Sequence, residues 1–166
     1  MYPVRFVVDC MLGSLARKLR IYGFDTKYDP KIDDETLLSI GLDNGRVLLT
    51  LDRSLVKVAI KRKVSAILLN GGNDEDRMVA VFQKLELRIN PIDPSEARCP
   101  ICNGNIIIAE KGMVSNQVSN KLLSEHEVFY VCAKCGKIYW EGGHWILLHS
   151  FFDRVERQLH SVTSKE

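Results

Sequence analysis

The sequence predicts a mixed α/β fold, in which a domain with a parallel sheet and helices on both faces precedes a small β-rich module and a C-terminal helix. Three observations lead to this prediction. Strand-like and helix-like apolar patterns alternate over residues 1–93, which is typical of a parallel sheet. A linker is expected at 94–98, in a polar stretch with two prolines. Two C-x-x-C pairs mark 99–149 as a metal-stabilised ribbon, followed by a helix and tail at 150–166.

Short apolar runs that end at polar residues predict the strands of the first domain, and apolar residues at helical spacing predict its helices. The expected strands are 4–8, 25–28, 47–50, 64–69 and 85–92. The expected helices carry Leu12 to Leu19, Leu37 to Leu42, Leu55 to Ala59 and residues 74–84, and Asp34 is expected to cap the second of them. Residues 151–160 also show helical spacing and are expected to pack back on one of the domains.

Four of the five cysteines form two matching knuckles, Cys99-Pro-Ile-Cys102 and Cys132-Ala-Lys-Cys135. Each C-x-x-C turn aims two thiolates at one point, and four sulfur ligands suit a structural zinc ion. Four thiolates leave no open position for water, so this metal is not expected to be catalytic. Redox dithiols or disulfides are disfavoured, because two such pairs occur in one small module. Strand-like segments at 106–108 and 128–131 are expected to form the hairpin of the ribbon, and Cys10 is expected to be buried.

The composition is that of a globular protein, with 46% hydrophobic and 27% charged residues. No apolar run approaches the roughly 20 residues of a membrane span. The first residues lack the layout of a signal peptide, so a cytoplasmic location is expected. The net charge of +2 does not indicate a nucleic-acid partner. Arg17, Lys18 and Arg20 lie close together, as do the basic residues at 57–63, and such patches can hold phosphates or simply be solvated helix faces.

Aspartates follow two of the predicted strands. Asp9 and Asp52 come after apolar strands whose carboxyl ends share one edge of a parallel sheet, and Asp34 begins a helix within reach of that edge. A fourth acid is expected from Asp74 or Asp76. Carboxylates crowded together repel unless a cation balances them, and oxygen ligands suit Mg²⁺ or Mn²⁺. Such an ion can activate water for phosphodiester cleavage.

Thr50 and Ser54 flank Asp52 and can hydrogen-bond its oxygens or a water molecule. The alternative interpretation is structural, since aspartates are common helix caps and turn formers.

Several segments resemble the Mut-seven C-terminal RNase domain family. They are the stretch from Phe6 to Thr26, Asp34-Glu-Thr-Leu-Leu, Gly45-Arg-Val-Leu-Leu-Thr-Leu-Asp-Arg53, the two cysteine knuckles, and Lys137-Ile-Tyr-Trp-Glu-Gly-Gly-His-Trp145. The resemblance extends from about residue 5 to 149. It implies a PIN-like nuclease domain fused to a zinc ribbon, with Asp9, Asp34 and Asp52 as the acidic site residues of a metal-dependent ribonuclease.

The sequence therefore leads to the hypothesis of an RNA-hydrolysing enzyme with structural zinc and catalytic Mg²⁺ or Mn²⁺. The ribbon is expected to bind or position RNA. Arg17, Arg20, His144 and Trp145 are the expected RNA contacts, because cations hold phosphates and aromatic rings stack on bases. The alternatives are a non-catalytic RNA- or ribosome-binding module, and a toxin-like component of a toxin–antitoxin pair.

Overall fold

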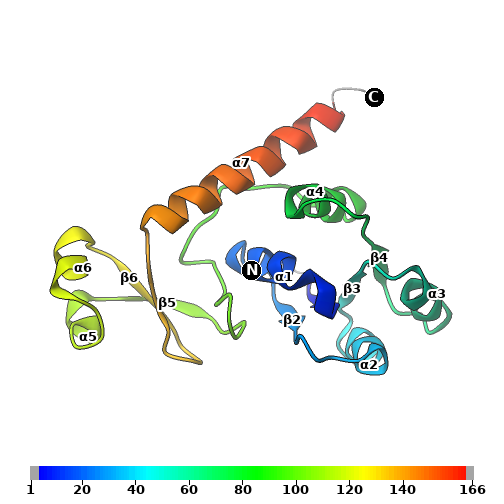
Figure 1. Cartoon of the computed structure of the whole chain (residues 1–166), viewed down its shortest axis with the longest axis horizontal. Helices are drawn as coiled ribbons and strands as arrows, with labels where there is room; N and C mark the ends of the chain where they lie inside the picture. Colours follow the sequence, from blue (N-terminus) through cyan, green and yellow to red (C-terminus); the bar gives the residue numbers. More distant parts are fainter. Residues whose placement is uncertain (1–3, 164–166) are drawn as a thin grey trace.

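A computed structural model describes residues 4–163, with side chains through residue 161. Within that range the chain forms a four-stranded parallel sheet in the order β2-β1-β3-β4 and a three-stranded antiparallel sheet in the order β5-β6-β7 (Figure 1). The parallel sheet consists of β1 (Phe6–Val8), β2 (Thr26–Tyr28), β3 (Val47–Thr50) and β4 (Ala66–Leu68). A 3₁₀ turn, Cys10–Leu12, and the helices α1 (Gly13–Ile21), α2 (Asp34–Asn44), α3 (Arg53–Lys61) and α4 (Asp74–Lys84) complete this domain.

Apolar clusters cover both faces of the parallel sheet, which confirms the α/β prediction. Phe6 and Val8 face a cluster that includes residues of α1 and α4. Val7 and Leu48 face the other way, into a cluster with residues of α2 and α3. All three residues of β1 are fully buried, which explains why this strand reads as a continuous apolar run rather than an alternating one.

The strand expected at 85–92 does not form. Glu86 has a positive φ of 50°, which turns the chain as α4 ends. Leu85, Leu87 and Ile89 then pack against the α1/α4 side of the core. The alternation of these leucine and isoleucine residues therefore reflects an irregular segment that packs on the core, not a fifth strand in the sheet.

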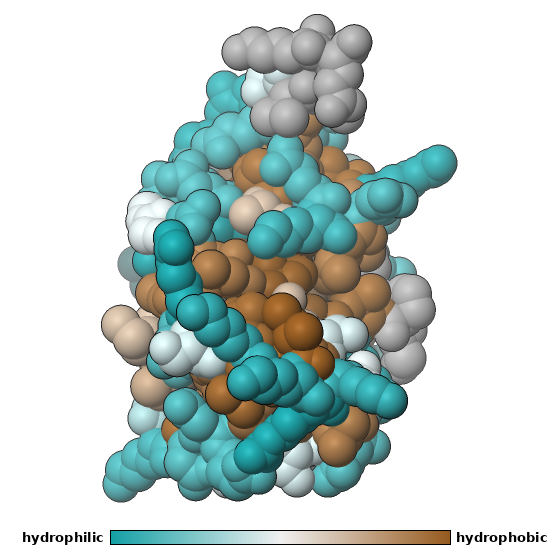
Figure 2. Space-filling view, turned by 90° about the vertical axis from the view of Figure 1, so that its right-hand side faces the viewer, coloured by the Kyte–Doolittle hydropathy of each residue, from teal (hydrophilic) through white to brown (hydrophobic). Residues whose placement is uncertain are grey.

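β4 is consequently an edge strand of the sheet. Lys84 Nζ donates a hydrogen bond to the Leu68 carbonyl oxygen at 3.3 Å, and a lysine at this position discourages pairing with another chain. The side of the molecule that carries α3 and β4 shows an apolar area rimmed by hydrophilic side chains (Figure 2).

The second sheet forms the ribbon. Its strands are β5 (Ile106–Ala109), β6 (Phe129–Cys132) and β7 (Ile138–Trp140), and the expected hairpin is confirmed as the antiparallel pair β5–β6. Two short helices, α5 (Lys111–Val114) and α6 (Asn120–Glu125), occupy the connection between those strands. Val114 packs with Ala109 and Phe129 in a small core of its own.

The last helix, α7 (Gly143–Thr163), is longer than the sequence predicts. It begins beside the ribbon and ends over α4 (Figure 1). Phe151, Phe152 and Val155 join the core of the α/β domain, where the rings of Phe152 and Tyr22 lie 5.2 Å apart. Because α7 begins at Gly143, His144 and Trp145 lie on this helix and not in a loop of the ribbon. Within residues 4–163, no helix has the length and apolar character needed to cross a membrane.

Candidate functional site

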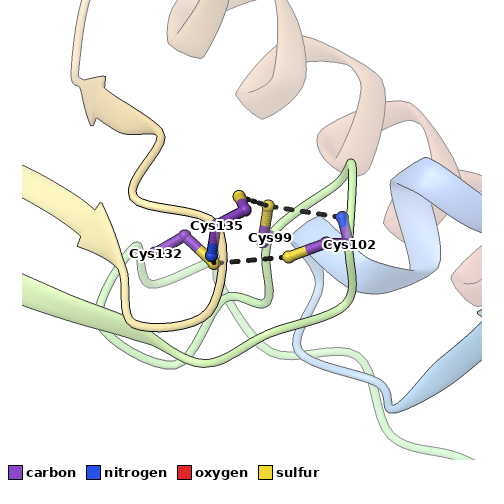
Figure 3. A group of neighbouring side chains, drawn as sticks. All are labelled: Cys99, Cys102, Cys132 and Cys135. Carbon is purple, nitrogen blue, oxygen red and sulfur yellow. Dashed lines mark hydrogen bonds between the residues drawn. The ribbon is translucent and has the colours of Figure 1, made fainter.

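The four knuckle cysteines converge on one point (Figure 3). Their Sγ atoms all lie within 4.8 Å of one another; the Cys102–Cys132 pair is 3.4 Å apart and the Cys99–Cys135 pair 3.7 Å. A tetrahedral zinc ion with Zn–S bonds of about 2.3 Å separates its sulfurs by about 3.8 Å. The donor set and its spacing therefore fit a closed four-sulfur metal site, as the C-x-x-C spacing predicts.

Backbone geometry closes each knuckle. The N–H groups of Cys102 and Cys135 donate to the sulfurs of Cys99 and Cys132, both at 3.5 Å. Left-handed residues follow the two turns, Asn103 with φ 64° and Gly136 with φ 72°. Asparagine is one of the few non-glycine residues that adopts this conformation readily.

The surroundings of Cys99 favour its thiolate form. Burial raises the pKa of this thiol, but hydrogen bonds from the Tyr139 hydroxyl and from backbone N–H groups outweigh burial and lower the pKa to about 6. The Tyr139 Oη to Cys99 Sγ distance is 3.0 Å. For Cys102, burial raises the pKa to about 12, and the neighbouring cysteine side chains add to this. A dication that replaces the thiol protons would remove this mutual penalty.

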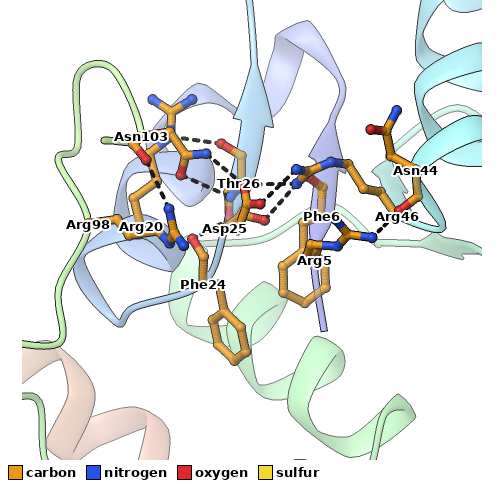
Figure 4. A network of polar contacts seen from close by, with 10 residues as sticks. All are labelled: Arg5, Phe6, Arg20, Phe24, Asp25, Thr26, Asn44, Arg46, Arg98 and Asn103. Carbon is orange, nitrogen blue, oxygen red and sulfur yellow. Dashed lines mark hydrogen bonds and ion pairs between the residues drawn. The ribbon is translucent and has the colours of Figure 1, made fainter. Parts of the chain in front are cut away.

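The first knuckle is also the joint between ribbon and α/β domain (Figure 4). Arg20 is only 4% exposed. Its Nε donates to the Thr26 carbonyl at 2.9 Å, and its Nη1 donates to the carbonyls of Pro100 at 2.9 Å and Ile101 at 3.1 Å. Arg20 thus satisfies carbonyl groups on both sides of the joint.

Asp25 lies beside Arg20 in the same network. It accepts two hydrogen bonds from Arg46, at 2.9 and 2.7 Å, and one from Asn103 Nδ2 at 2.7 Å. Burial raises the pKa of Asp25, yet these donors outweigh burial and hold the pKa below its usual value. Asn103 also accepts a hydrogen bond from the Thr26 backbone N–H at 3.0 Å. This residue, which directly follows the first knuckle, thus bonds to two adjacent residues of the α/β domain.

The carboxyl-terminal edge of the parallel sheet brings Asp9 and Asp52 to one hydroxyl group. Thr50 Oγ1 donates to Asp9 Oδ2 at 2.6 Å and accepts from the Asp52 backbone N–H at 2.9 Å. Asp9 is 7% exposed. Asp52 Oδ1 accepts from the Ser54 N–H at 2.6 Å and so caps α3. Thr50 therefore links the two acidic residues.

Asp34 is exposed at the first position of α2. Asp33 caps this helix instead, because its Oδ1 accepts from the Thr36 N–H at 2.7 Å; the expected cap at Asp34 is wrong by one residue. A hydrogen bond to Asp9 raises the pKa of the Cys10 thiol, and the charge of Asp34 adds to the shift, so both carboxylates lie near Cys10. Among the side chains of residues 4–161, the four cysteines are the one group of three or more potential metal ligands close enough together to hold a single ion.

The two candidates for a fourth acid differ in their partners. The Asp74 carboxylate forms ion pairs with Lys18 Nζ at 2.7 Å and with Arg77 Nη1 at 3.0 Å. Burial raises the pKa of Asp74, but hydrogen bonds from Lys18, Ser14 and Arg77 outweigh burial, so the pKa lies below its usual value. Asp76 is exposed. The charge of Asp74 is thus already balanced, whereas Asp76 faces solvent.

A groove of about 940 Å³ lies between α1, the ribbon and the beginning of α7. Its lining includes all four of the expected RNA contacts, namely Arg17, Arg20, His144 and Trp145. It also includes Lys137 and Tyr139 from the ribbon. The tertiary structure therefore gathers residues from both ends of the chain at one surface.

Comparison with known protein families matches residues 4–152 to the Mut7-C RNAse domain. The chain belongs to the Mut7-C RNAse domain family. A search of curated proteins found no match. Membership in this family indicates a nuclease that acts on RNA.

Not every expected site residue of this Mut7-C domain lies where the sequence suggests. Arg20 holds the joint, so its guanidinium is already occupied by three carbonyls. Cys10, expected to be buried, is exposed, because Leu12 is the residue of that turn that enters the core. Trp140, to which the sequence assigns no RNA contact, also lines the groove and is 37% exposed. No sequence pattern marks Arg46 or Asn103 as part of the network at the joint, because their hydrogen-bond partners there lie far from them along the chain.

Proposed function

We propose that this Mut7-C domain hydrolyses RNA phosphodiester bonds with Mg²⁺ or Mn²⁺ held at Asp9, Asp34 and Asp52. The observation that carries the proposal is the Asp9–Thr50–Asp52 chain at the carboxyl edge of a parallel sheet, where α/β proteins bind ligands. The Thr50 and Ser54 hydrogen bonds use Asp9 Oδ2 and Asp52 Oδ1. The second oxygen of each carboxylate is the one assigned to the cation.

The residues present suit this role chemically. Carboxylate oxygens are the preferred ligands of Mg²⁺ and Mn²⁺, and a bound ion would supply a nucleophilic water and balance charge on the phosphate. Thr50 holds Asp9 in one orientation, and the capping bond does the same for Asp52. Asp34 and Asp76 are exposed and free to approach a cation or a water molecule.

The cysteine site has a structural role in this proposal, separate from the role of the carboxylates. We assign it to structural zinc, because four thiolates fill a tetrahedral shell and leave no position for substrate. A thiolate site requires reduced cysteines, which supports a reducing compartment such as the cytoplasm. The ribbon then serves to position RNA beside the α/β domain.

The test is cleavage of a labelled single-stranded RNA by zinc-loaded protein with added Mn²⁺ or Mg²⁺. We expect Asp9→Asn with Asp52→Asn to lower the rate at least about 100-fold, since removal of metal ligands removes the activated water. Zinc content and circular dichroism should be unchanged.

The matched control is Asp43→Asn with Asp153→Asn, which removes the same charge from two exposed positions and should cleave at the parental rate. A double ligand variant that cleaves as fast as this control would refute the assignment of the acids. Cleavage without any added divalent ion would refute the metal requirement.

A non-catalytic RNA-binding module is the second candidate. The structural uses of Asp52, which caps α3, and of Asp74, which is ion-paired, favour it. Tight RNA binding without cleavage in any metal would establish this alternative.

A further inference from the structure

We propose that the groove between α1, the ribbon and the beginning of α7 is the binding site for a single-stranded segment of RNA. This inference rests on the proposed function for the choice of RNA as the ligand, but not on catalysis. It places the nucleic acid on the joint between the two parts of the molecule, away from the basic residues of α3.

Charge is unevenly distributed in favour of this groove. Its lining has five basic side chains and one acidic side chain, whereas the whole chain has 23 basic and 21 acidic residues. The acid, Glu141, accepts a hydrogen bond from Tyr130 Oη at 2.8 Å. Such an excess of cations along a groove attracts a phosphate backbone.

Two of the basic side chains are free to contact phosphate. Arg17 on α1 and Lys137 before β7 are exposed, and the part of the chain that the structure describes holds no ion pair for either of them. The other three have structural partners: Lys18 is paired with Asp74, and Arg20 and Arg98 donate to backbone carbonyls. Arg17 comes from α1 and Lys137 from the ribbon, so each of these two parts of the groove lining contributes one cation without an ion pair.

Aromatic side chains line the same groove. They are Tyr28, Tyr130, Tyr139, Trp140 and Trp145, five of 21 lining residues, compared with 8% aromatic residues in the whole chain. Trp140 is 37% exposed. Rings in a groove can stack only on unpaired bases, because the faces of paired bases are already stacked within a helix. The geometry therefore favours a single strand over a duplex.

One residue of the groove lining contacts the chain segment that follows Asp9. Tyr28 lines the groove, and its Oη donates to the carbonyl oxygen of Cys10 at 3.1 Å. Cys10 directly follows Asp9. Ser14, at the beginning of α1, is also part of the lining. Tyr28 thus connects the groove lining to the residue next to Asp9.

The test is RNA binding by fluorescence anisotropy, with an unstructured single-stranded RNA, the matching duplex, and zinc-loaded protein that carries Asp9→Asn and Asp52→Asn to prevent cleavage. Within this background, Arg17→Glu with Lys137→Glu should weaken single-strand binding at least tenfold. The slope of log affinity against log salt should fall by about 1.4, since each lost phosphate contact contributes about 0.7. Lys57→Glu with Lys61→Glu on α3 is the charge-matched control and should bind like the background.

Stacking is tested separately. Trp140→Ala should weaken binding on the order of tenfold, and Trp140→Phe should restore most of the affinity, because phenylalanine keeps an aromatic face. Zinc content and circular dichroism of each variant establish that the ribbon is intact.

The proposal is overturned if the groove variants bind like the background, if the α3 control weakens binding equally, or if the duplex binds as tightly as the single strand. The outcome is independent of catalysis. If the parent protein binds RNA through the groove but cleaves no RNA, the nuclease function is refuted and the groove proposal is supported. If the groove variants of an otherwise active protein cleave RNA at the parental rate, the nuclease function is supported and the groove proposal is refuted.

Discussion

At the scale of single residues, two arginines on the same helix, three positions apart, have different roles. Arg17 and Arg20 lie on the same helix, but Arg17 faces solvent and Arg20 is 4% exposed. The guanidinium of Arg20 donates to carbonyls that belong to β2 and to the first cysteine knuckle. Its planar set of donors suits this bridging role better than a lysine would.

Arg20→Ala should therefore lower the free energy of unfolding by about 2–4 kcal/mol, because it takes the donor from three carbonyl groups, of which that of Thr26 is buried. Urea unfolding of the zinc-loaded protein measures this. Arg17→Ala is the matched control and should change stability by no more than about 0.5 kcal/mol. A stable Arg20→Ala protein with weakened RNA binding would show that Arg20 contacts phosphate after all.

At the scale of elements, the ribbon has few apolar residues with which to hold itself together. Its own core contains Ala109, Val114 and Phe129 as buried members. The two knuckles bring the ends of its strands to one metal site, and Tyr139 on β7 hydrogen-bonds to Cys99. A small module of this kind depends on its metal for stability.

Removal of the metal with a strong chelator should therefore increase amide hydrogen exchange across residues 99–140, while β1 and β3 of the parallel sheet stay protected. The fully buried strands of the α/β domain have their own core. Re-addition of zinc should restore the original exchange pattern and is the control. A ribbon with unchanged exchange after complete zinc loss would contradict a structural role for the metal.

At the scale of the whole molecule, two contacts hold the ribbon against the α/β domain. One is the polar joint at Arg20, Asp25 and Asn103 (Figure 4). The other is α7, which begins beside the ribbon and runs over α4 (Figure 1). Its Phe151 and Phe152 side chains belong to the core of the α/β domain. The groove lining includes Arg20 from the joint and Leu148 from α7, so the groove is built from both contacts.

Phe152→Ala should destabilise the protein by about 3–5 kcal/mol, since it removes a nearly fully buried ring from the contact between α7 and the domain. Urea unfolding checks the size of the effect, and hydrogen exchange should show the loss concentrated in α7 and α4. Ile146→Ala on the same helix is the control, because Ile146 is 68% exposed. Equal effects of both substitutions would contradict the packing described for α7.

The sequence alone determined the parts of this protein that depend on local spacing. Alternating apolar patterns established the parallel α/β domain, and the two C-x-x-C turns established the four-sulfur site, because both depend on short-range periodicity. The tertiary structure decided everything that depends on partners far apart in the chain. It assigned Arg20 to the joint, placed residues 85–92 on the core instead of in the sheet, and brought Arg17 and Lys137 into the lining of one groove. The type of a side chain determines which bonds it can form. Which of these bonds does form depends on the carbonyl group, the ion or the open surface that the folded chain places beside it.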